Sequence, residues 1–211
     1  MGVGIVPMEF ARDGIRVDTV EINPAVVPVA VHYFDFQPAQ VSLTIGDGRH
    51  FLNRSKRQYD AVILDAFVGD SFPSHLMTRE TFVAVKRLLR PNGCLLVHSF
   101  GDIKPGQDYL LGSLNKTLAT VFSRLRVHTT GQGAFFFVAG DGLADHPTKP
   151  FVPQTIHPEA QDEVLTAFAS TVDALPDTGI VLTDDFNPAD YYDAQNREML
   201  RRRLALSARQ M

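Results

Sequence analysis

The sequence contains a single cysteine, Cys94, among its 211 residues. One cysteine excludes an intrachain disulfide and a metal cluster held by several thiolates. Cys94 begins the apolar run 94–97 and is predicted to be a small core residue, because buried free cysteines behave as hydrophobic side chains. The histidines show no spacing that suits a metal ion, so no metal site is predicted.

Long apolar runs and an excess of basic charge are also lacking. No stretch has the roughly 20 apolar residues that a membrane helix needs, and the amino terminus does not resemble a signal peptide. These absences predict a cytoplasmic chain with no membrane segment. The formal net charge of -4 argues against a general nucleic-acid binder and suits a neutral or cationic small substrate. The basic stretch 197–209 is predicted to be a solvated helix face, with contact to anionic lipid or nucleic acid as the alternative.

Short aliphatic runs alternate with stretches of helical spacing in the first half of the chain. Thr78 can cap a helix whose apolar residues recur on one face. A proline and a glycine within 90–93 predict the end of this helix. Residues 23–24 predict another helix start, and Pro28 predicts that this helix is short or kinked. Strands that alternate with helices imply a parallel sheet covered on both faces. The predicted strands are 17–20, 41–45, 61–64 and 95–97.

The second half of the chain predicts an antiparallel ending to this sheet. A helix over 109–122 precedes strands at 125–127 and 134–139, which a tight turn at 130–133 joins. This ending is typical of the methyltransferase-type fold, an α/β, doubly wound, mostly parallel sheet with an antiparallel strand near its carboxyl terminus. We predict a nucleotide-binding α/β domain over 1–140, extended by a C-terminal loop and helical segment over 141–211. The extension is expected to contain helices at 159–175 and 189–209 and a polar loop at 183–188.

Glycines and acids near the predicted strand ends are candidate cofactor-binding residues. Gly2 and Gly4 precede a helix, where backbone N–H groups can approach a ligand, although a flexible amino terminus is the alternative. Glu21 ends the first predicted strand, where its carboxylate can accept hydrogen bonds from two ribose hydroxyls or remain a solvated strand-end acid. Asp47, followed by Gly48, is placed to meet an adenine amino group and can equally cap the next helix.

Asp65, directly after the strand 61–64, is the first candidate catalytic residue. Ligands of open α/β sheets bind beyond the carboxyl ends of the strands. Glu21, Asp47 and Asp65 are therefore expected along one edge. A carboxylate at the third position could hold a protonated amine and assist its deprotonation before attack.

Further polar residues follow in two loops. Asp70 is a second candidate catalytic and substrate-binding acid, with a turn residue as the alternative. His75 is a candidate substrate contact that could equally be a loop or core histidine. The adjacent acids Asp184 and Asp185 repel each other, so a cation, a helix start or solvent must satisfy them. Asp185 is a candidate substrate contact, and a helix start at Pro188 is the alternative.

In their order along the chain, these motifs resemble the polyamine aminopropyltransferase family, which includes spermidine synthase, in the class I S-adenosylmethionine-dependent methyltransferase superfamily. The resemblance is closest to the spermidine synthase-like branch. It implies transfer of an aminopropyl group from decarboxylated S-adenosylmethionine to an amine. It also implies that Glu21 binds the ribose, Asp47 binds the adenine, and Asp65 orients or deprotonates the amine. The motifs are 2–4, 20–24, 46–49, 59–65 and 89–93.

Departures from that family leave other functions open. The family's first strand and its N-terminal β-hairpin domain are expected to be missing, and Val68 stands where the family has a second acid. One alternative is an S-adenosylmethionine-dependent methyltransferase that acts on a small or amine-bearing substrate. The other is a non-catalytic ligand-binding or assembly domain whose open strand edges a second copy covers, which predicts a homodimer.

Overall fold

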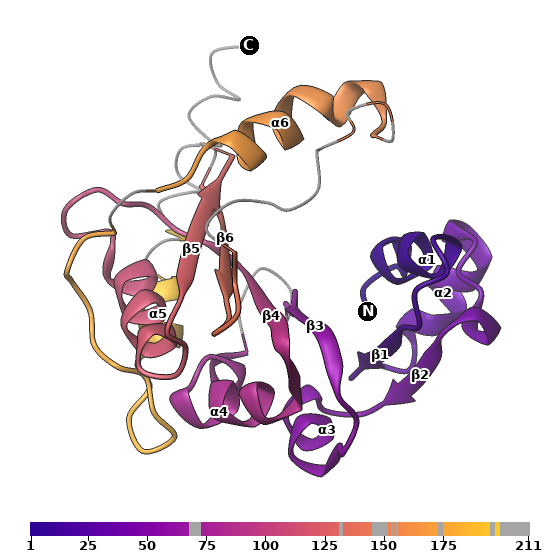
Figure 1. Cartoon of the computed structure of the whole chain (residues 1–211), viewed down its shortest axis with the longest axis horizontal. Helices are drawn as coiled ribbons and strands as arrows, with labels where there is room; N and C mark the ends of the chain where they lie inside the picture. The colour runs from indigo at the N-terminus through magenta and orange to yellow at the C-terminus, as the bar shows by residue number, and fades with distance from the viewer. Residues whose placement is uncertain are drawn as a thin grey trace. The chain divides into compact units, whose positions relative to one another are not determined.

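The fold is described from a computed structural model, which covers residues 1–67, 73–130, 133–144, 152, 154, 156–172, 175–194 and 197–198. The chain divides into two compact units, Met1–Lys56 and Arg57–Met211, which Figure 1 shows coloured by residue number. Within the described residues, no helix has the length and apolar character needed to cross a membrane. The predicted division near residue 140 stays a prediction.

The first unit is built on two parallel strands. β1 (Asp18–Glu21) pairs with β2 (Ser42–Ile45) in a register that sets Glu21 opposite Ile45. A small core is formed by Met8, Ala30 and Phe36. The helical segments of this unit are α1 (Ile5–Arg12), α2 (Val26–Phe34), η1 (Pro38–Gln40) and α3 (Gly48–Arg54).

Helix α2 begins two residues later than the sequence pattern predicts. Asn23 accepts a hydrogen bond from the Ala25 N–H through its side chain and one from the Val26 N–H through its carbonyl, which makes a turn before the helix. The helix is nine residues long, so the prediction of a short helix is confirmed. Pro28 lies in its first turn, where a backbone N–H has no intrahelical partner to lose.

The second unit holds a four-stranded sheet in the order β3-β4-β6-β5. β3 (Tyr59–Leu64) runs parallel to β4 (Leu89–Phe100), and β6 (Ala134–Ala139) runs antiparallel to both β4 and β5 (Leu125–Thr129). The predicted α/β sheet with an antiparallel ending is therefore confirmed. Residues 131–132 of the predicted turn lie outside the described residues.

Helices α4 (Arg79–Leu88) and α5 (Tyr109–Ala119), labelled in Figure 1, carry many buried side chains of this unit. The apolar residues that recur at helical spacing in both helices are buried, as this spacing predicts. Phe82 and Val85 of α4 and Leu111 and Leu118 of α5 are all fully buried, as is Phe137 of β6.

The segment after α4 differs from its prediction. The predicted end of the helix is confirmed, but residues 90–93 form the irregular start of β4 instead of a turn. The β3–β4 register shifts between Tyr59 and Ala61, which accommodates the proline at position 91. A Cβ atom on Gly93 would lie 2.9 Å from the Tyr59 carbonyl oxygen, so the close strand approach requires glycine there.

The predicted helix over 159–175 is shorter in the structure. It consists of η4 (Pro158–Ala160) and α6 (Gln161–Ala169), and residues 170–172 then run along β5. His128 of β5 forms an antiparallel bridge with Thr171, and its Nδ1 lies 3.0 Å from the Ala167 carbonyl oxygen. Edge pairing with β5 explains the early end of the helix. Residues 189–194 are helical, and the basic residues from 199 onward lie outside the described part of the chain.

The cap of α4 gives a testable contribution to stability. Thr78 is buried, and its Oγ1 accepts a hydrogen bond from the Thr81 N–H at 3.3 Å. Replacing Thr78 with alanine should lower the free energy of unfolding by about 1 kcal/mol, because the N–H loses its acceptor. Urea denaturation measures this change, and Thr78→Ser, which keeps the hydroxyl, should recover most of it. Equal stability of the alanine and wild-type proteins would contradict a stabilising cap.

Candidate functional site

The glycine pair at the amino terminus directly precedes a helix, as predicted. Gly4 is the N-cap of α1 and has φ +86°, and a Cβ atom there would lie 2.4 Å from Cδ2 of Phe36. Both the backbone conformation and the packing therefore require glycine at this position. Gly2 also has positive φ, and the space around its Cα is open. That either glycine contacts a ligand stays a prediction.

Glu21 is a partly buried and partnered acid at the end of β1. Its side chain is only 11% exposed, and its Oε2 lies 3.4 Å from the Met1 ammonium nitrogen. Its Oε1 accepts a hydrogen bond from the Asn23 N–H at 2.9 Å. These contacts fix the carboxylate at the carboxyl end of the strand. The predicted ribose contact of Glu21 stays a prediction.

Asp47 follows β2 and is the N-cap of α3, the helix that Gly48 begins. Its Oδ1 accepts a hydrogen bond from the His50 N–H at 2.8 Å. The predicted cap is therefore confirmed, and binding of adenine stays a prediction. Because β1 and β2 are parallel with Glu21 opposite Ile45, Glu21 and Asp47 lie at the same end of this two-stranded sheet.

In the second unit, Asp65 forms a hydrogen-bonded pair with His98 of β4. The Asp65 Oδ1 and His98 Nδ1 atoms are 3.0 Å apart. The Asp65 side chain is 50% exposed, whereas that of His98 is only 18% exposed. The hydrogen bond with His98 lowers the pKa of the Asp65 carboxyl below its usual value and outweighs the opposing effect of burial. Asp65 is therefore ionised at neutral pH and can bind a cation.

Aromatic rings surround the imidazole of His98. His98 stacks on Phe136 with ring centroids 4.6 Å apart and an interplanar angle of 17°. Phe67 meets the histidine ring edge-on at 5.4 Å, and Phe100 lies 4.8 Å from it at a tilt of 58°. Apolar surroundings strengthen a hydrogen bond, because water competes less well for its donor and acceptor.

Sequence reasoning did not identify His98 as a candidate site residue. The parallel register sets Leu64 of β3 opposite Val97 of β4, so the next residues in that register are Asp65, directly after β3, and His98, still within β4. The signal in the sequence is a polar residue directly after an apolar run in each of two strands. This signal becomes useful only once the register is known, because a shift of one residue turns the side chain to the other face.

The other predicted substrate contacts are more dispersed. His75 is exposed and lies in the short 3-10 helix η2 (Ser74–Leu76), where its carbonyl oxygen accepts a hydrogen bond from Thr81 Oγ1. Asp185 is exposed in the loop before residue 189. Asp70 lies outside the described residues. Among the described residues, no three or more histidine, cysteine, aspartate or glutamate side chains are grouped so as to hold a metal ion.

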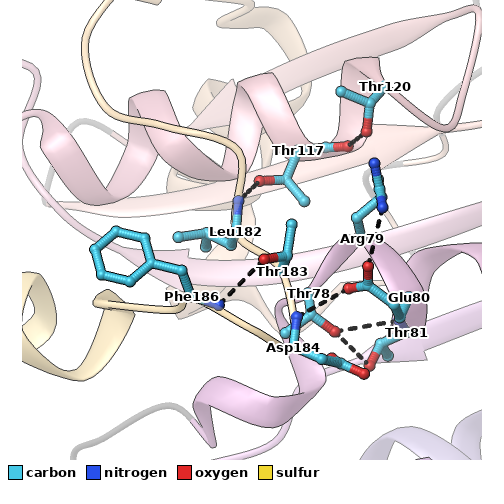
Figure 2. Close-up of polar contacts among 10 residues, drawn as sticks. All are labelled: Thr78, Arg79, Glu80, Thr81, Thr117, Thr120, Leu182, Thr183, Asp184 and Phe186. Carbon is cyan, nitrogen blue, oxygen red and sulfur yellow. Dashed lines mark hydrogen bonds and ion pairs between the residues drawn. The ribbon is translucent and has the colours of Figure 1, made fainter.

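The loop that carries Asp185 is anchored to the start of α4 and to the carboxyl-terminal part of α5 (Figure 2). Leu182 donates its N–H to Thr117 Oγ1 at 2.9 Å and accepts a hydrogen bond from the Arg79 N–H at 2.9 Å. The Asp184 N–H donates to the Glu80 carboxylate at 3.0 Å. These contacts hold the loop against α4 and α5 and leave the Asp185 side chain on the surface.

The helix start near Pro188 is satisfied by a neighbouring residue. The Asn187 Oδ1 accepts a hydrogen bond from the Ala189 N–H at 3.0 Å, while its Nδ2 donates to the Ser74 carbonyl oxygen at 2.7 Å. Asn187 therefore supplies the side-chain cap at this helix start, and whether the helix start accounts for Asp184 and Asp185 stays untested. The substrate role of Asp185 stays a prediction.

Comparison with known proteins places this chain in a family. A model of the spermine/spermidine synthase domain matches residues 14–130, more than half of the chain. A polyamine aminopropyltransferase of Vibrio vulnificus is 31% identical over 206 residues, which cover 90% of this chain and 67% of that protein.

Solved structures share the fold. A probable spermidine synthase from Corynebacterium glutamicum superposes with a TM-score of 0.61 at 21% identity, covering 70% of this chain and 56% of that one. Human methyltransferase-like protein 13 in complex with SAH gives a TM-score of 0.58 at 21% identity, with 80% and 79% of the two chains covered. The methyltransferase-like fold is thus confirmed, and the chain belongs to the spermine/spermidine synthase family.

Proposed function

We propose that this protein binds decarboxylated S-adenosylmethionine and transfers its aminopropyl group to a small amine. The observation that carries this proposal is the ionised, half-exposed carboxylate of Asp65 at the carboxyl end of β3, in a chain of this family. A carboxylate at this strand end suits an ammonium group. The name of the Vibrio vulnificus relative supports the same transfer.

The donor is assigned to residues of the first unit. Glu21 is proposed to accept hydrogen bonds from the ribose hydroxyls, and Asp47 to accept one from the adenine amino group. Both carboxylates lie at the same end of the β1–β2 pair. Because glycine has no side chain, we propose that the backbone N–H groups at Gly2, Gly4 and Gly48 can approach the donor closely. Each of these acids already accepts a hydrogen bond from its own backbone neighbourhood, which orients it before a ligand arrives.

The acceptor amine is assigned to Asp65, with Asp70, His75 and Asp185 as further proposed contacts. The amine nitrogen attacks the carbon next to the sulfonium, so a C–N bond forms while the C–S bond breaks. The electron pair of that bond leaves with the sulfur, which becomes the thioether of methylthioadenosine. Before attack the substrate ammonium gives one proton to the Asp65 carboxylate, which passes it to solvent, so that the neutral amine has the lone pair for the new bond. Holding amine and sulfonium in line is the main requirement for such a displacement.

Calorimetric titration tests the donor assignment. We expect the full chain to bind decarboxylated S-adenosylmethionine more tightly than S-adenosylmethionine, and methylthioadenosine to compete with both. Preference for S-adenosylmethionine would instead favour methyl transfer, which the shared fold also supports. A folded chain that binds none of the three would contradict the proposal and favour a non-catalytic domain.

A further inference from the structure

His98 stands out as a polar side chain within an apolar environment and next to the proposed catalytic acid. Its ring is in contact with Phe67, Phe100 and Phe136, and Nδ1 faces Asp65. The other ring nitrogen, Nε2, is buried, and no described residue hydrogen-bonds to it. Burying a ring nitrogen without a hydrogen-bond partner costs free energy, and an apolar side chain would fill the same space more favourably. The presence of histidine at this position therefore needs an explanation.

The hydrogen of this pair resides on Nδ1. An ionised carboxylate can only accept hydrogen bonds, so the histidine must donate. The contact is therefore an Nδ1–H···Oδ1 hydrogen bond to a charged acceptor, which is stronger than one between neutral groups. Among the described residues of the second unit, His98 is the ionisable group that acts on Asp65.

We propose that His98 is a positioning residue for the transfer reaction, which holds Asp65 in one rotamer so that its Oδ2 faces the acceptor amine. This inference rests on the proposed function, in which Asp65 receives the amine. No described residue hydrogen-bonds to Oδ2, so the hydrogen bond at Oδ1 leaves the second oxygen for a ligand. Stacking on Phe136 fixes the plane of the imidazole, which in turn fixes the direction of its N–H.

Three variants separate this role from simple packing. His98→Phe keeps an aromatic ring against Phe136 but removes the donor. His98→Asn places an amide nitrogen near the position of Nδ1 and should restore part of the hydrogen bond. His128→Phe is the matched control, because His128 lies on β5 and its Nδ1 lies 3.0 Å from a backbone carbonyl oxygen instead of a carboxylate.

Two measurements are made on each full-length variant, after its circular dichroism has shown that it is folded. Titration followed by carbon-13 NMR gives the pKa of the Asp65 carboxyl, with Asp65→Asn used to assign its signal. Steady-state kinetics with saturating decarboxylated S-adenosylmethionine and a diamine give kcat and KM. In His98→Phe we expect the Asp65 pKa to rise and kcat to fall by about 10-fold, the usual scale for a hydrogen bond to a charged group. His98→Asn should lie between this variant and the wild type, and His128→Phe should match the wild type.

The possible results distinguish this inference from the proposed function. An unchanged Asp65 pKa in His98→Phe overturns the inference, because the hydrogen bond would then be unimportant to the acid. A raised pKa with unchanged kcat also overturns it, since positioning would not serve turnover. If the wild type transfers no aminopropyl group to any amine, the proposed function fails, whatever the NMR titration shows.

Discussion

Replacing Asp65 with asparagine is expected to lower kcat for aminopropyl transfer by about 100-fold or more, the range that a positioned acid or base contributes. Asparagine has nearly the same shape, so the effect isolates the charge. A neutral amide neither attracts the ammonium group nor accepts its proton. Calorimetry should show that donor affinity is unchanged, because the donor is assigned to the first unit.

Asp60→Asn is the matched control for this experiment. Asp60 lies on the same strand, has an 81% exposed side chain and pairs with Arg90. The same chemical change at that position should leave kcat unaltered. If Asp65→Asn retains wild-type turnover, or if Asp60→Asn loses as much activity, the assignment of Asp65 as the catalytic carboxylate is wrong.

Replacing Glu21 with alanine is expected to weaken donor binding by about 1–3 kcal/mol, which is up to about 100-fold in Kd. The variant loses the proposed ribose hydrogen bonds together with the carboxylate that the Asn23 N–H and the Met1 ammonium group hold in place. Isothermal titration with decarboxylated S-adenosylmethionine measures the change.

Two further variants show whether the weaker donor binding of Glu21→Ala comes from the lost carboxylate. Glu21→Gln keeps the acceptor for the Asn23 N–H but replaces one carboxylate oxygen with an amide, so its Kd should be intermediate. Glu9→Ala removes an exposed acid of α1 that pairs with Arg12, and it should bind the donor like the wild type. An unchanged Kd in Glu21→Ala would remove Glu21 from the donor site.

Most of the fold follows from local patterns in the sequence. Strand β6 has the predicted bounds, since an unbroken apolar run shows where a buried strand begins and ends. The cap at Thr78 was predictable because one hydroxyl before an amphipathic run satisfies a backbone N–H. The start of β4 was not predictable from Pro91 and Gly93, because only pairing with β3 decides whether such residues turn or extend.

Some residues of the candidate site could likewise be predicted from local sequence patterns, and others could not. Glu21, Asp47 and Asp65 are recognisable because each ends or follows a strand, and the carboxyl ends of strands are where such sheets bind ligands. The Asp47 cap was visible from the adjacent glycine and the following helical residues. His98 required the register of two strands that are distant in sequence, and only tertiary structure supplies that register.

Aminopropyl transfer by this protein must form two products, and detecting both of them is the decisive experiment. The full chain is incubated with decarboxylated S-adenosylmethionine and a set of diamines and polyamines, and the mixture is analysed by mass spectrometry, with Asp65→Asn as the control. We predict equal amounts of methylthioadenosine and of an amine enlarged by one aminopropyl group, both strongly reduced in the variant. A folded, donor-binding chain that forms neither product would contradict aminopropyl transfer. So would a chain that forms a methylated product from S-adenosylmethionine instead.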